Sequence, residues 1–129
     1  MPHADRLPDT PLEADVFSRM CASREVFQHV TGRWGALVVV ALGQSESAMR
    51  FGELRRRVDG ISDRMLSQTL AQLEREGVVE RTVRSTIPPH VDYVLTPLGQ
   101  KLAEPLSALT SIIESELPQV LEARSIYER

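Results

Sequence analysis

The feature that most constrains the fold lies between residues 50 and 95, where two short amphipathic segments precede two segments with strand periodicity. Residues 50–58 predict a short helix, and the Asp-Gly pair at 59–60 supplies a tight turn. A second helix begins after Ser62, a good N-cap residue, and stops at Gly77. Two short helices joined by a glycine-containing turn are the signature of a helix-turn-helix.

Directly after this unit the periodicity changes from that of a helix to that of a strand. Residues 78–84 and 91–95 are rich in β-branched and aromatic side chains, which favour strands. Pro88 and Pro89 lie between them and cannot continue a β ladder, so they indicate an exposed hairpin loop. A helix-turn-helix followed by a hairpin is a winged helix. We therefore expect a mainly α fold with a small β-hairpin wing, in the α+β class.

Three further helical segments precede the helix-turn-helix. Residues 12–20 are expected to form a short N-terminal helix whose apolar residues recur at intervals of four. Ser23 is the expected N-cap of a second helix that ends at Gly32. Residues 33–42 are apolar on nearly all sides, which predicts a helix buried at the centre of the domain.

A long amphipathic helix is expected after the wing, from about residue 97 to 117, with Thr96 as its cap and a kink at Pro105. A winged-helix core leaves little room for it, so we expect its apolar stripe to pack against a second subunit. The alternative is a helix folded back onto its own domain. The residues expected at the dimer interface, with those of the N-terminal helix, are Leu12, Val16, Met20, Leu102, Leu106, Leu109, Ile112, Ile113 and Leu117.

The length of 129 residues fits one domain. We expect a flexible leader over residues 1–11 and a single winged helix-turn-helix domain over 12–129. The leader has no apolar run of the kind a signal peptide requires, and no stretch is long enough to cross a bilayer. The chain is therefore expected to be cytoplasmic, without a membrane partner.

The net charge of -3 is distributed unevenly along the chain. Residues 50–91 contain eight arginines against six carboxylates, whereas residues 1–20 and 100–129 are both net negative. Arginine offers a planar fork suited to phosphates and guanine edges, so this bias fits a nucleic-acid surface. The alternative is that these arginines only solvate helix faces.

Enzymatic and metal chemistry find little support in the sequence. His3, His29 and His90 lie far apart with no HxxxH or HExxH spacing, so we expect no metal site. No triad, carboxylate pair or nucleotide-binding fingerprint is visible, so we expect neither an enzyme nor a cofactor. The single cysteine, Cys21, excludes an internal disulfide.

A set of spaced residues over about 21–103 resembles a known family. These residues are Cys21, Trp34, Arg50-Phe51, Glu53-Leu54, Gly60-Ile61-Ser62, Met65-Leu66, Leu70, Leu73-Glu74, Gly77, Val79, Arg81, Pro88-Pro89, Val91, Tyr93, Leu95-Thr96 and Gly99. The pattern resembles the HxlR-type winged helix-turn-helix transcription regulators of bacteria, relatives of the MarR family. The resemblance implies a homodimer that binds double-stranded operator DNA, with flanking helices at the dimer interface. It also implies a response to a small molecule, an electrophile or an oxidant.

The recognition helix is expected at about residues 62–76 and the wing at about 78–95. Arg64 and Gln68 are the candidates for base edges, and Ser62 and Ser67 for phosphates. The complete set of expected DNA-binding residues is Arg50, Arg55, Arg57, Ser62, Asp63, Arg64, Ser67, Gln68, Gln72, Arg84 and His90. For any single arginine, a solvated side chain is the alternative.

Cys21 lies just before a helix start and three residues from Arg24, surroundings that favour a reactive thiolate. Some regulators of the family that this chain resembles sense oxidation through a cysteine at this position, which makes Cys21 a candidate redox sensor. The alternative is a packed hydrophobic residue. For the whole chain, the alternative function is a winged-helix module that binds protein and no longer binds DNA.

Overall fold

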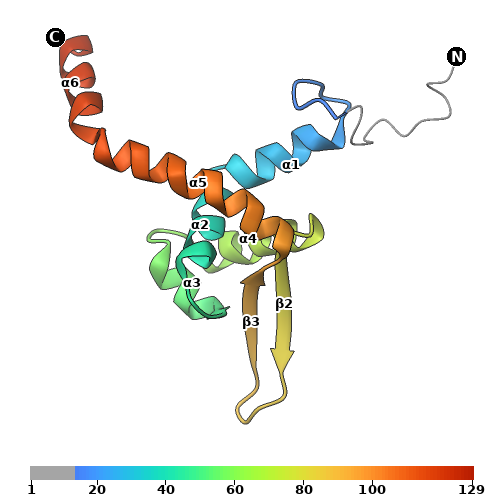
Figure 1. The fold of residues 1–129 in the computed structure, drawn as a ribbon. Coiled ribbons are helices and arrows are strands. Elements are labelled where there is room, and N and C mark those ends of the chain that lie inside the picture. Colours follow the sequence, from blue (N-terminus) through green and yellow to red (C-terminus); the bar gives the residue numbers. More distant parts are fainter. Residues whose placement is uncertain (1–13) are drawn as a thin grey trace, which may run out of the picture.

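The apolar segment predicted at the centre of the domain forms α2 (Gly35–Gln44). Val38 and Val39 of this helix are fully buried. Helices α1 (Ala22–Thr31), α3 (Phe51–Arg57), α4 (Asp63–Arg75) and α5 (Pro97–Ser115) pack around it in the computed structural model, which describes residues 14–129 (Figure 1). The buried side chains of α2, α3 and α4 form one continuous core, as the helix-turn-helix pattern predicts.

Helix boundaries follow local signals in the sequence. Ser62 caps α4 by accepting a hydrogen bond from the backbone N–H of Met65 at 3.1 Å. Gly60 has a φ of 90°, a left-handed conformation that glycine adopts readily, and it forms the turn before α4. The cap of α1 differs from the prediction, because Cys21 occupies the N-cap position in place of Ser23.

The wing consists of β2 (Val79–Arg84) and β3 (His90–Leu95), which are antiparallel and project away from the helices (Figure 1). The loop between them contains Pro88 and Pro89, as expected. A third strand, β1 (Met49–Arg50), pairs with the other edge of β3 and was not predicted. The sheet order is β1-β3-β2, and the winged-helix prediction is confirmed.

One prediction about the flanking segments is wrong. Residues 14–20 form turns in place of the expected helix over 12–20, and Leu12 lies outside the described residues. The C-terminal helix α5 continues through Pro105 and ends at Ser115, close to the expected end near residue 117, and a further helix that was not predicted, α6 (Leu117–Tyr127), follows it. Pro118 lies in the first turn of α6, where its missing N–H costs no helical hydrogen bond.

Helices α5 and α6 extend well beyond the core at the end of the molecule opposite the wing (Figure 1). No side chain of α6 is buried in the isolated chain. Within residues 14–129, none of the helices combines the length and apolar character needed to cross a membrane.

Candidate nucleic-acid interface

Helix α4 has one face in the core and one face in solvent. Its buried side chains are Leu66, Thr69, Leu70 and Leu73. The opposite face carries an exposed row made of Arg64, Ser67, Gln68 and Gln72, all of them predicted DNA-binding residues. Arginine and glutamine side chains suit the edges of guanine and adenine, respectively. The packing of α4 therefore leaves a polar reading surface in solvent, which we call the α4 row.

Ser62, Asp63 and Arg55 lie together at the N-terminal end of α4. The guanidinium of Arg55 forms an ion pair with the carboxylate of Asp63 at 3.1 Å, and both side chains are more than half exposed. Asp63 is in the first turn of α4, where a negative charge interacts favourably with the positive end of the helix dipole. Of these predicted site residues, Ser62 also stabilises the helix, because its Oγ accepts the capping hydrogen bond.

A second group of predicted residues gathers on the wing around Asp92, which was not predicted. Arg84 Nε donates a hydrogen bond to Asp92 Oδ2 at 2.8 Å, and His90 Nε2 lies 3.3 Å from Oδ1. Arg50 of β1 pairs in register with Asp92. The hydrogen bond from Arg84, with the charges of His90, Arg84 and Arg50, lowers the pKa of the Asp92 carboxyl in spite of its partial desolvation.

The strand register explains how this cluster forms. Arg84 and His90 face each other across β2 and β3, and Asp92 follows His90 by two residues on the same face of the strand. Thr86 Oγ1 lies 3.2 Å from His90 Nδ1 and fixes the ring on its other side. The i, i+2 spacing of His90 and Asp92 is visible in the sequence. Arg50 and Arg84 come close to Asp92 only because β3 pairs with β1 and β2.

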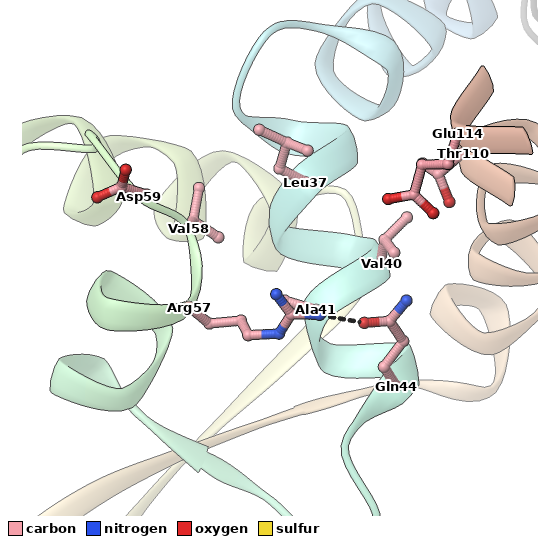
Figure 2. Close-up of a pocket in the computed structure, with 9 residues that line it drawn as sticks. All are labelled: Leu37, Val40, Ala41, Gln44, Arg57, Val58, Asp59, Thr110 and Glu114. Atoms are coloured by element: carbon pink, nitrogen blue, oxygen red, sulfur yellow. Dashed lines mark hydrogen bonds between the residues drawn. The ribbon is translucent and has the colours of Figure 1, made fainter. Parts of the chain in front are cut away.

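Arg57 is directed away from the α4 row. Figure 2 shows its side chain reaching across to α2, where Nη2 donates a hydrogen bond to Gln44 Oε1 at 2.7 Å. Both residues line a pocket of about 210 Å³ between α2, the end of α3 and α5, with the carboxylates of Asp59 and Glu114 at its rim. Ligand pockets usually exceed about 300 Å³, so this pocket is small for an organic effector.

The predicted dimer residues divide into two groups. Leu106 is only 9% exposed and belongs to the core of its own chain, and Leu102 packs against that core. By contrast, Leu109, Ile112, Ile113 and Leu117 are all about half exposed, as are Val120 and Leu121 of α6. Helical spacing places Val120 and Leu121 on the same side of α6 as Leu117, whereas Ile126, which is also exposed, lies on the opposite side. We call the first six residues the α5–α6 apolar face. Val16 and Met20 are exposed as well, on the segment before α1.

Cys21 is 6% exposed at the N-cap of α1, and its Sγ lies 3.0 Å from Ser23 Oγ. It lines a surface hollow with Arg19, Met20 and Arg24. The Arg24 guanidinium that was expected to influence the thiol donates a hydrogen bond to the backbone carbonyl of Phe17 at 3.1 Å. The thiol is therefore well packed, at a helix N-terminus and beside a surface hollow.

Comparisons with known proteins agree with this geometry. Residues 29–120 match the family of HxlR-like helix-turn-helix domains. The HTH-type transcriptional regulator YtfH of Escherichia coli (strain K12) is 47% identical over 112 residues, which cover 87% of each chain.

Solved structures share the same arrangement of elements. The structure of the transcriptional regulator ytfH from Salmonella typhimurium superposes with a TM-score of 0.79 at 46% sequence identity, covering 88% of this chain and 99% of that one. The redox regulator HypR in its oxidized form superposes with a TM-score of 0.66 at 30% identity, covering 74% of this chain and 96% of that one.

Proposed function

Because the chain belongs to the HxlR-like helix-turn-helix family of transcriptional regulators, we propose that it is a homodimer that binds double-stranded operator DNA through α4 and the wing. The α4 row carries this proposal, since it places Arg64 and Gln68 in solvent on a capped helix whose other face is fixed in the core. Side chains held on a rigid helix can hydrogen-bond base edges in the major groove.

The wing supplies the phosphate contacts in this proposal. Arg84 and His90 contact the carboxylate of Asp92, and the charge of Arg50 also acts on it, so two arginines and a histidine lie around one carboxylate. Arg84 remains about half exposed while bonded to Asp92, which orients its guanidinium without covering it. Phosphate contacts of this kind position a protein on the duplex, whereas base contacts specify the sequence.

Dimerisation is supported by the α5–α6 apolar face. Six large apolar side chains recur at helical spacing along α5 and the start of α6, which exceeds the scattered exposed residues that are normal for a monomer. A symmetric dimer would also present two α4 rows to two operator half-sites, which raises affinity when each single surface has only a modest positive charge.

A fluorescence anisotropy titration tests the DNA proposal, with a labelled duplex from the intergenic region upstream of the gene. We expect the Arg64→Ala/Gln68→Ala variant to bind at least about 30-fold more weakly, since one good bidentate base contact contributes about 1–3 kcal/mol. The matched control is Gln100→Ala/Lys101→Ala, which removes the same amide and one positive charge from an exposed part of α5. Equal affinities for both variants would contradict the assignment of α4.

Salt dependence separates DNA binding from the protein-interaction alternative. Operator affinity should fall steeply between 50 and 200 mM salt, because each neutralised phosphate releases a counterion. Absence of binding at low salt, in a protein that is folded and dimeric, would reject the DNA proposal and favour a module that binds protein.

We further propose that oxidants or electrophiles control DNA binding through Cys21. Support comes from the position of this thiol at a helix N-terminus beside a hollow, and from the redox regulator HypR among the structural neighbours. Diamide, peroxide or quinones should release the wild-type protein from DNA and leave the Cys21→Ser variant bound. Equal release of both proteins would reject Cys21 as the sensor. The alternative effector would then be a small ligand that binds in the region of the dimer interface.

A further inference from the structure

We propose that Glu25, His29 and Glu76 bind a divalent transition-metal ion of the Zn²⁺ type. Glu25 and His29 lie one turn apart on α1, and Glu76 follows the last residue of α4. One carboxylate oxygen from each glutamate and a ring nitrogen of His29 all lie within 4.8 Å of one another. The cluster therefore joins α1 to the C-terminal end of the proposed recognition helix.

The imidazole of His29 supplies the strongest reason for an ion at this place. Its Nδ1 is buried and has no hydrogen-bond partner among residues 14–129. The nearest carboxylate atom is Glu76 Oε1 at 3.8 Å, which is too long for a hydrogen bond. Leaving a buried polar atom unsatisfied is costly, and a metal ion bound at this place would satisfy it.

A zinc ion fits the spacing of these atoms. In a tetrahedral site with metal–ligand bonds of about 2.0–2.2 Å, adjacent ligand atoms are about 3.4 Å apart. The separation of 3.8 Å between His29 Nδ1 and Glu76 Oε1 needs to shorten by only a few tenths of an ångström. Glu25 is exposed and would supply the ligand on the solvent side of the site. The ion could enter from this side.

The charges of the two carboxylates favour a divalent cation at this site. Within residues 14–129, neither Glu25 nor Glu76 forms an ion pair with a lysine or arginine, although the two carboxylates lie close together. A divalent ion offsets their repulsion and leaves the cluster neutral. An imidazole ligand favours zinc, copper or nickel over magnesium and calcium, which prefer oxygen donors alone.

An ion held by both helices would restrict the movement of α1 relative to α4. The consequence for operator binding rests on the proposed function of α4, whereas the metal site itself does not. The spacing of the histidines in the sequence does not reveal this cluster, because its ligands are a Glu-x-x-x-His segment and a distant glutamate that only the packing of α1 on α4 brings together.

The test is a competition titration of the full-length, untagged protein with Zn²⁺ alone against a colorimetric chelator. We expect one ion per chain, and at least about tenfold weaker binding in each of the variants Glu25→Gln and Glu76→Gln. Both changes keep the size of the side chain, and Glu25 is exposed, so the fold should be retained. The matched control is Glu74→Gln, an exposed carboxylate of α4 outside the cluster, which should bind zinc as the wild type does.

Substitution with Co²⁺ adds a second readout, because a tetrahedral site with a nitrogen ligand gives intense visible absorption that the Glu25→Gln variant should lose. A wild-type chain that binds no zinc would overturn the proposal and leave His29 and Glu76 as neighbouring side chains without an ion. Unchanged zinc binding in the Glu25→Gln/Glu76→Gln double variant would overturn it as well. Neither measurement contains DNA, so failure here is distinct from failure of the DNA proposal.

Discussion

Replacing Ile112 by alanine should strongly weaken the proposed homodimer. Ile112 is 59% exposed in the isolated chain, in the middle of the α5–α6 apolar face. Complete burial of an isoleucine side chain contributes about 1.5–3 kcal/mol, so burial of the part still exposed contributes about 1–2 kcal/mol. A two-fold interface uses the same surface twice, which raises the loss to about 2–4 kcal/mol. The dimer dissociation constant should therefore rise by a factor of roughly 30 to 1000.

Sedimentation equilibrium over a range of protein concentrations measures this constant directly. The matched control is Val83→Ala, because Val83 is 58% exposed but lies on the wing, far from α6 in the chain and outside the apolar face. We expect the control to dimerise as the wild type does. Equal weakening by both substitutions, or a wild-type chain that sediments as a monomer at every concentration, would refute the reasoning.

Two further predictions concern the elements that carry the proposed interface. Ser62→Ala removes the hydrogen bond to the Met65 N–H and should lower the free energy of unfolding by about 1 kcal/mol in urea denaturation, whereas Ser67→Ala, on the exposed face of the same helix, should change it little. The second concerns pH: because the bond from Arg84 lowers the folded-state pKa of Asp92, this carboxylate stabilises the fold above its unfolded pKa, near 4, and the contribution is lost as pH falls through the lower, folded value. The melting temperature of Asp92→Asn should therefore depend less on pH between about 2 and 5 than that of the wild type, and parallel curves would contradict the assignment.

Local signals in the sequence were sufficient for the helix-turn-helix and the wing. Ser62 and Thr96 were identified as caps because each has a side-chain oxygen placed before an apolar-periodic segment, and both accept hydrogen bonds from the expected helical turn. The loop at Pro88 and Pro89 followed from the absence of donors for a β ladder. These features depend on neighbouring residues in the chain, so no tertiary information was needed.

The errors occurred where distant residues decide the structure. β1 has only two residues, too few to show a periodicity, and it exists because Met49 and Arg50 pair with Tyr93 and Asp92. The spacing of Val16 and Met20 suggested a helix, but residues 14–20 form turns. The C-terminal helix was expected to end near residue 117, and the further helix α6 beyond it was not expected.

In the candidate site too, the features that local periodicity determines were predicted, and those that depend on distant residues were not. Exposure of the α4 row followed from helical periodicity, since the buried leucines determine the opposite face. By contrast, no spacing in the sequence indicated that Arg57 would bond to Gln44, or that Arg84, His90 and Arg50 would gather at Asp92. Those contacts join separate elements, and their geometry is fixed only by the packed core.

The junction between α4 and α5 determines how a movement at the proposed dimer interface would reach the two α4 helices. Thr96 Oγ1 donates a hydrogen bond to the carbonyl of Gly77, directly after α4, and accepts one from the N–H of Gly99 in the first turn of α5. Its backbone N–H also bonds to the carbonyl of Val78 at 3.0 Å. The C-terminal end of α4, the base of the wing and the start of α5 are thus fastened at one residue. In the proposed dimer, a small rotation of one α5 against its partner would therefore change the distance between the two α4 helices without altering either of them, and the register on operator DNA would be set from the dimer interface.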